Sequence, residues 1–138
     1  MKRIVAFVLL LCVFITPVYA DEETANEIMP IHEVVSSIDY FFVINSAGIA
    51  SVDFNYILAE KPQSIRIETK IQKRFLLVFW NDVDGGQWTD SFTTTIGSFT
   101  HNLQLSKTGT YRAVFSVYAV GADGSVDDFE LTKEYVYE

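Results

Sequence analysis

Two histidines are the residues of this chain best suited to acid–base chemistry, and they stand far apart in the sequence. His32 lies in a segment that we predict to be flexible, and His101 lies on a predicted strand. Neither belongs to a visible set of zinc ligands or to a histidine-base motif. The Gly-x-Ser-x-Gly and His-Glu-x-x-His motifs, the phosphate loop and the dinucleotide fingerprint are also absent. We therefore predict no catalytic site, no cofactor and no metal ion.

The acidic residues offer two further kinds of chemistry. Any two of the 18 Asp and Glu side chains could form the carboxylate pair of a glycosidase, but acids on strands and turns of an acidic protein usually face solvent. Asp82, Asp84 and Gly85 match part of a calcium loop, although the third ligand and the distal Glu are missing. We interpret this segment as a turn, and the chain as a protein that is not an enzyme.

The first twenty residues have the pattern of an export signal. Lys2 and Arg3 precede an apolar run over residues 4–15, and a polar break ends at Ala20. A membrane-spanning helix needs about 20 apolar residues, and Pro17 ends this run too early. We predict a signal peptide over residues 1–20, cleavage after Ala20, an extracellular location and no stable membrane anchor after cleavage.

The cysteine content bears on disulfide bonds, and the net charge bears on the classes of partner that the chain can bind. Cys12 is the only cysteine and lies within the predicted signal, so the mature chain has no disulfide. Loss of Lys2 and Arg3 changes the net charge from −8 to −8 − 2 = −10. A charge of this sign argues against nucleic acid and against anionic membranes as partners.

Hydrophobic patterning indicates one all-β domain. Residues 21–33 are predicted to be a flexible acidic leader, and residues 34–138 to be a single sandwich. Apolar and polar residues alternate, and turn residues interrupt them about every ten positions, which is typical of a sandwich or barrel. We predict about seven strands, over residues 37–44, 50–58, 65–80, 87–96, 99–105, 110–120 and 126–137.

Two of these strands have clear inner faces. Ala50, Val52, Phe54, Tyr56 and Leu58 alternate with polar residues, as do Ile65, Ile67, Thr69 and Ile71. The residues that alternate with this second set lie on the outer face of the same strand and are mostly cationic.

The entry to the strand over 110–120 carries a resemblance to known proteins. Gly109 and Tyr111 match the tyrosine corner of immunoglobulin-like domains, and Ala113 stands where that family has a cysteine. Together with the residues after Gly48, the stretch at 71–73 and the two tryptophans, this segment resembles small secreted immunoglobulin-like or fibronectin-III-like proteins of Gram-positive bacteria. The resemblance implies an immunoglobulin-like antiparallel β-sandwich and says little about activity. In that architecture the strand that begins at residue 65 pairs with the strand over 110–120. The outer face of the sheet would then place the basic residues beside the acidic ones, namely Arg66, Lys70, Arg74 and Arg112 beside Asp128, Glu130 or Glu134.

The stretch from Phe75 to Trp88 is the predicted partner surface. Residues 75–80 are all apolar, so if Leu76, Val78 and Trp80 enter the core of a strand there, the alternate residues must face outward. The alternatives are that the leader or the Gly85-Gly86 loop covers that face, or that a bulge turns the strand. The candidate surface residues are Phe75, Leu77, Phe79, Trp80 and Trp88.

Three classes of function fit these observations. We predict a secreted, non-catalytic binding or adhesion module for a protein partner, because immunoglobulin-like sandwiches bind through strand edges and loops. A carbohydrate-binding module is an alternative if Trp80 and Trp88 are exposed and coplanar. A structural protein that forms homo-oligomers through residues 75–80 is the other.

Overall fold

The chain forms an antiparallel β-sandwich of seven strands. The computed structural model describes residues 33–59 and 62–138, so the predicted signal peptide and most of the predicted leader lie outside the described residues. One sheet has three strands in the order β1 (Val35–Ile44), β2 (Ile49–Leu58) and β5 (Ile96–Gln104). The other sheet has the order β4 (Phe79–Phe92), β3 (Pro62–Phe75), β6 (Gly109–Gly121) and β7 (Val126–Tyr137). The predicted immunoglobulin-like sandwich is therefore confirmed.

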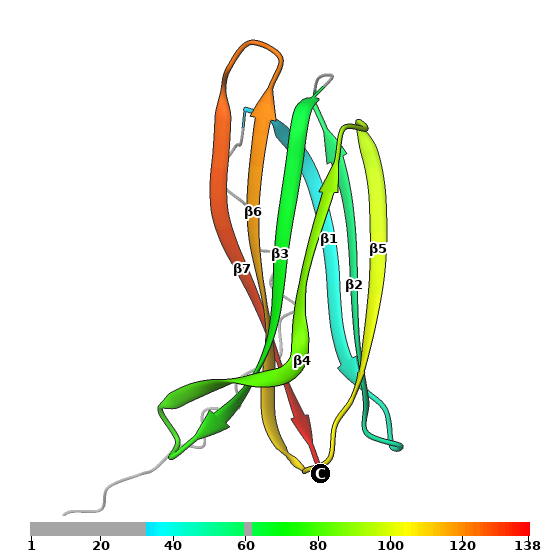
Figure 1. Cartoon of the computed structure of the whole chain (residues 1–138), viewed down its shortest axis with the longest axis vertical. Coiled ribbons are helices and arrows are strands. Elements are labelled where there is room, and N and C mark those ends of the chain that lie inside the picture. The colour runs from blue at the N-terminus through cyan, green and yellow to red at the C-terminus, as the bar shows by residue number, and fades with distance from the viewer. Residues whose placement is uncertain (1–32, 60–61) are drawn as a thin grey trace, which may run out of the picture.

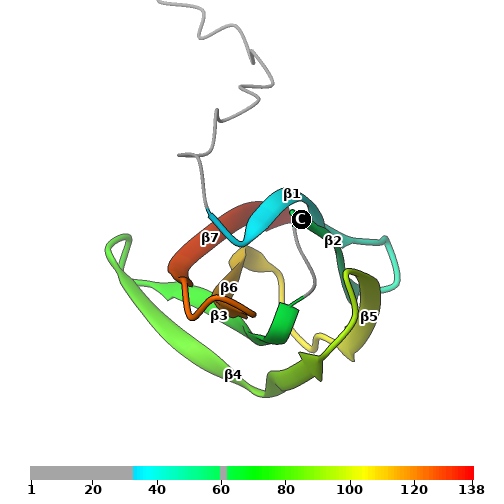
Figure 2. The same cartoon turned by 90° about the horizontal axis from the view of Figure 1, so that it is seen from above.

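The two sheets enclose one core. Figure 1 shows the long strands running along the molecule, and Figure 2, seen from above, shows the sheets facing each other. Every residue assigned to the two inner faces is buried: Ala50, Val52, Phe54, Tyr56 and Leu58 on β2, and Ile65, Ile67, Thr69 and Ile71 on β3. The alternation of apolar and polar residues predicted these faces, because each of the two strands has the core on one side and solvent on the other. No helix in the described part of the chain is long and apolar enough to cross a membrane.

The predicted tyrosine corner is present on β6. Tyr111 is buried, and its hydroxyl donates a hydrogen bond to the carbonyl oxygen of Lys107 at 2.5 Å. Burial, and then the nearby Tyr137, raise the pKa of the Tyr111 phenol above its ordinary value. Gly109 adopts a positive φ of 141°, which side-chain-bearing residues rarely reach, so this glycine sets the entry of the chain into the corner.

The charged outer face of the four-stranded sheet is also as predicted. Strand β6 lies between β3 and β7, so Arg66, Lys70, Arg74 and Arg112 share a sheet with Asp128, Glu130 and Glu134. The Nη2 atom of Arg74 lies 2.9 Å from a carboxylate oxygen of Glu134. This face is a solvated network of charges across neighbouring strands.

Two predicted boundaries were wrong. The turn between β4 and β5 lies at residues 93–95, and Gly97 and Ser98, predicted to form that turn, belong to β5. Gly97 pairs with Tyr56, and its lack of a side chain leaves space for the Tyr56 ring. This glycine therefore allows the ring to lie close to the β5 backbone and does not form a turn. Likewise, residues 81–86 do not end a strand but lie within β4, where the pairing with β3 is irregular.

Candidate functional site

The turn that joins β3 to β4 exposes an unbroken run of large apolar side chains. Phe75 pairs with Phe79, and Leu76, Leu77 and Val78 form the connecting turn. All five side chains are apolar, and their exposed fractions range from 52% for Phe75 to 85% for Leu77. We call residues Phe75–Phe79 the apolar tip. Isolated exposed apolar residues are normal, but five in succession make this turn the candidate for an interaction surface.

The structure corrects the predicted conformation of this stretch. Residues 75–80 were expected to form one strand, whose alternate side chains would lie on opposite faces. Instead the chain reverses direction over residues 76–78, so Leu76 and Val78 are exposed together with their neighbours. The alternating rule failed because it applies only within a strand. Phe75, Leu77 and Phe79 do face outward, as part of a turn and not of an edge-strand face.

The apolar tip stands beyond the main sheet. Strand β6 pairs with β3 only as far as Lys73, so Arg74 and the residues after it pair with β4 alone. The end of the hairpin is therefore a two-stranded ribbon that projects from the body of the sandwich (Figures 1 and 2). No further strand pairs along either edge of this ribbon among the described residues, and all five side chains at its end are exposed.

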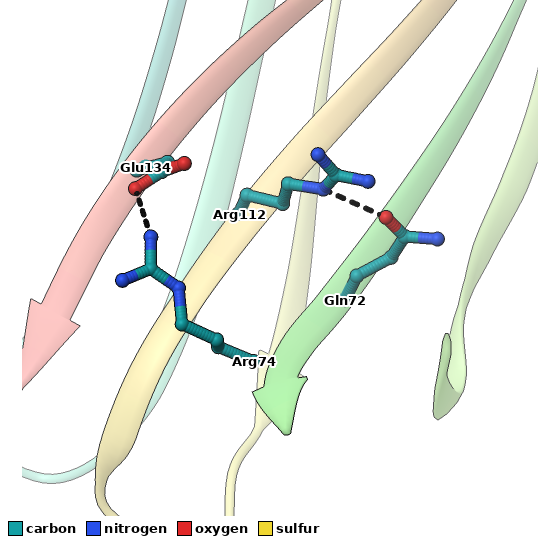
Figure 3. Close-up of polar contacts among 4 residues, drawn as sticks. All are labelled: Gln72, Arg74, Arg112 and Glu134. Carbon is teal, nitrogen blue, oxygen red and sulfur yellow. Dashed lines mark hydrogen bonds and ion pairs between the residues drawn. The ribbon is translucent and has the colours of Figure 1, made fainter. Parts of the chain in front are cut away.

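The base of the ribbon is held by cations and an indole ring. The guanidinium carbon of Arg112 lies 4.3 Å from the centre of the Trp80 ring system, and that of Arg74 lies 4.9 Å away. Arg74 reaches over β6 to Glu134, and Arg112 Nε donates to the side-chain oxygen of Gln72 at 2.8 Å (Figure 3). These contacts fix the orientation of Trp80 and stiffen the ribbon where it leaves the sheet.

The backbone of the apolar tip is strained. Leu76 has a φ of 48° and Leu77 a φ of 69°, the only positive values among the described residues other than glycine. The left-handed region costs an L-residue with a Cβ roughly 1–2 kcal/mol. Asn and Gly enter this region most readily, yet the turn carries two leucines. Strain without compensating burial is a reason to look for a role in binding.

Trp88 does not share a surface with Trp80. It pairs with the buried Thr69 and packs toward the core, whereas Trp80 pairs with Arg74 on the outer face. The Trp88 ring stacks on the His101 imidazole, with centroids 4.7 Å apart and planes 2° apart. The two tryptophans therefore lie on opposite faces of β4 and do not form the coplanar platform that the carbohydrate hypothesis requires.

Gly85 and Gly86 were predicted to form a surface loop. They lie instead within β4, between the two tryptophans. Gly86 is buried, and a Cβ there would come within 3.1 Å of the Ile71 and Leu103 side chains. Gly85 has a φ of 77°, which a side chain would disfavour. The glycine pair thus permits the strand to bend close to the core.

The polar groups that could do chemistry are occupied by packing. His101 Nε2 lies 2.7 Å from an oxygen of Asp90, and the imidazole is held between that carboxylate and Trp88. Asp82 accepts hydrogen bonds from the side-chain amides of Gln72 and Gln87. In the described ranges no group of three or more His, Cys, Asp or Glu side chains could hold a metal ion. His32 lies outside the described residues.

Sequence reasoning identified part of this site and missed the rest. Of its five candidates, the structure brings Phe75, Leu77 and Phe79 together in the apolar tip, sets Trp80 at the base and leaves Trp88 elsewhere. Leu76 and Val78 were not among the candidates, and the contact of Trp80 with two arginines was not predicted. The sequence signal for this site was the run of six apolar residues over 75–80, because a half-buried strand cannot bury all of them on one face.

Comparison with known proteins identifies neither a family nor a function. No protein-family model matches the chain, and no curated protein matches its sequence. Among solved structures, the crystal structure of the ApaA protein from Bordetella pertussis contains a chain that is similar to this one. It is 13% identical, the match covers 78% of this chain and 96% of that one, and the TM-score is 0.40.

Proposed function

We propose that this protein is a secreted, non-catalytic binding module that meets its partner with the apolar tip. The observation that carries the proposal is the tip itself, five exposed apolar side chains at the end of a projecting ribbon. Burying a leucine or phenylalanine side chain fully is worth about 1.5–3 kcal/mol. Contact with a partner recovers this energy, which the folded chain alone leaves unused at residues 75–79.

Secretion is supported by the charged start, apolar run and polar break of the first twenty residues. A non-catalytic role is supported by the way the described polar groups are engaged. His101, the histidine that the structure describes, is stacked and paired inside the seam between β4 and β5. Binding by a projecting loop on a rigid sandwich is a common use of this architecture.

The test is binding of the purified protein to intact cells of the producing organism. We expect the protein to bind, and the double variant Leu76→Asn/Leu77→Gly to bind at least ten-fold more weakly. Loss of two leucine side chains from an interface removes about 3 kcal/mol or more, and 1.4 kcal/mol is a factor of ten. The readout is the fraction of protein that sediments with the cells over a range of protein concentrations.

A matched control uses exposed apolar residues far from the tip. Phe41 and Val43 are about half exposed on the outer face of β1, in the three-stranded sheet. We expect the variant Phe41→Ser/Val43→Thr to bind like the unaltered protein. Equal binding by the tip variant and the unaltered protein contradicts the proposal, as does a loss of equal size in the control.

A further inference from the structure

The geometry points to a lipid bilayer surface as the partner of the apolar tip, into which the tip inserts to a shallow depth. This inference rests on the proposed function, because it names the partner of the same site. It is carried by the order in which residue types follow one another along the ribbon and by the chemistry of the tip.

The paired residues of the β3–β4 hairpin, here called rungs, change in chemical type with distance from the turn. Starting at the turn, the first rung pairs Phe75 with Phe79, and the second pairs Arg74 with Trp80. The third rung pairs Lys73 with Asn81, and the first carboxylate appears only on the fourth, where Gln72 pairs with Asp82. The sequence of chemistry away from the tip is therefore apolar, then aromatic and cationic, then cationic, then acidic.

A bilayer has the same order of environments from its interior outward. Apolar side chains partition into the acyl region, tryptophan favours the interface, and arginine and lysine extend toward the phosphates. The guanidinium groups of Arg74 and Arg112 both lie against the Trp80 ring. The base of the ribbon thus places an indole and two cations at the level where a membrane interface accommodates both.

The length of the apolar part fits a shallow insertion. Successive rungs of a ribbon are spaced by about 3.4 Å, and the turn extends by roughly one to two further residues. The apolar part beyond the Trp80 rung is therefore on the order of 7–10 Å long. Interfacial segments bury their apolar face by about 5–10 Å, so the tip reaches the boundary between headgroups and acyl chains and goes no deeper.

A protein pocket fits the tip less well. Protein interfaces have about one hydrogen bond per 100–200 Å² of buried area, and these bonds fix the orientation of the partners. The five side chains of the tip carry no polar atom, and the hairpin that bears them projects from the sandwich. A bilayer requires no directional bonds and receives a projecting apolar segment readily, so this surface is better matched to lipid than to a shaped protein site.

The acidic charge of the chain limits the contact to the tip. The net charge of −8, or −10 without Lys2 and Arg3, disfavours broad contact with an anionic membrane. On the ribbon itself, however, the cations of Arg74 and Lys73 lie nearer the turn than the carboxylate of Asp82. Glu134 is paired with Arg74. Insertion driven by apolar side chains should therefore occur on zwitterionic lipid and persist at high salt, in contrast to electrostatic adsorption.

The test uses vesicles of phosphatidylcholine and the natural fluorescence of Trp80. The chain has two tryptophans, so Trp88→Phe leaves Trp80 as the sole reporter. We expect its emission to shift to shorter wavelength with added vesicles, and bromine atoms placed high on the acyl chains to quench it more than bromine placed deep. Co-sedimentation of the unaltered protein with vesicles provides a second measurement that does not depend on the Trp88 replacement.

The tip variant is the comparison. Leu76→Asn/Leu77→Gly should lower the vesicle-bound fraction at least ten-fold, and Phe41→Ser/Val43→Thr should leave it unchanged. Raising the salt concentration from 0.1 to 1 M, which shortens the screening length from about 10 to about 3 Å, should not release the bound protein. Release by salt would show electrostatic adsorption and overturn the inference.

The remaining outcomes separate the lipid inference from the proposed function. If vesicles fail to bind the protein while binding to cells still depends on the tip, the partner is a protein or glycan and only the lipid inference falls. If light scattering without lipid shows dimers that the tip variant abolishes, a second copy covers the tip and the lipid inference is overturned. If neither cells nor vesicles distinguish the tip variant, both proposals fall.

Discussion

Replacing Asp127 by Ala is expected to lower the free energy of unfolding by about 3–5 kcal/mol. Asp127 lies on β7 and is 6% exposed, and its carboxylate accepts hydrogen bonds from three consecutive backbone N–H groups where the chain enters β1. The donors are Val35 at 2.8 Å, Val34 at 2.9 Å and Glu33 at 3.2 Å. Alanine leaves the two buried donors without this acceptor, and each such loss costs about 1–3 kcal/mol.

Two companion substitutions test the reason for that loss. Asp127→Asn keeps one acceptor oxygen and should lose about half as much stability as Asp127→Ala. Asp128→Ala removes an exposed carboxylate from the next position on β7 and should leave stability unchanged. Urea denaturation followed by circular dichroism measures all three. If Asp127→Ala costs less than 1 kcal/mol, this carboxylate does not hold the first strand to the sandwich.

Gly97→Ala is expected to cost about 2–3 kcal/mol, although Gly97 has an ordinary backbone conformation. A Cβ at this position would lie 2.6 Å from two ring carbons of Tyr56, the residue paired with it on β2. The Tyr56 ring has little room to move, because it is 1% exposed and packs against Phe92 with centroids 5.5 Å apart. The added methyl group must therefore displace a large core side chain.

A double-mutant cycle isolates this steric effect. In the background of Tyr56→Leu, which lacks the ring, Gly97→Ala should cost less than 1 kcal/mol. Ser98→Ala, at the exposed neighbouring position, serves as the control for a change on the same strand. A loss of the same size in both backgrounds would show that the glycine is needed for a reason other than the Tyr56 ring.

Both residues show where reasoning from sequence reaches its limit. Gly97 was assigned to a turn because glycine is common there, yet whether a glycine turns the chain or admits a ring depends on the facing strand. Asp127 lies in an acidic strand where carboxylates normally face solvent. Its buried position depends on backbone groups more than 90 residues away in the chain. No local pattern contains that information.

The parts that were predicted well are those fixed by local pattern or by a family motif. The inner faces of β2 and β3 followed from alternation, and the corner at Tyr111 from its spacing to Gly109. The apolar tip was located but given the wrong conformation. Its turn contains no Gly, Asn, Asp or Pro, so local turn chemistry did not indicate a reversal at Leu76 and Leu77.

The central claim is that the apolar tip provides contact surface and contributes nothing to the stability of the fold. The most direct measurement is the free energy of unfolding of Leu76→Asn/Leu77→Gly compared with the unaltered protein, without any partner. Both replacements suit positive φ, and the exposed leucine side chains make few contacts to lose. We predict that the variant is more stable by about 1–2 kcal/mol. A variant that is less stable by 1 kcal/mol or more would contradict the account, because it would show that the two leucines are packed parts of the fold.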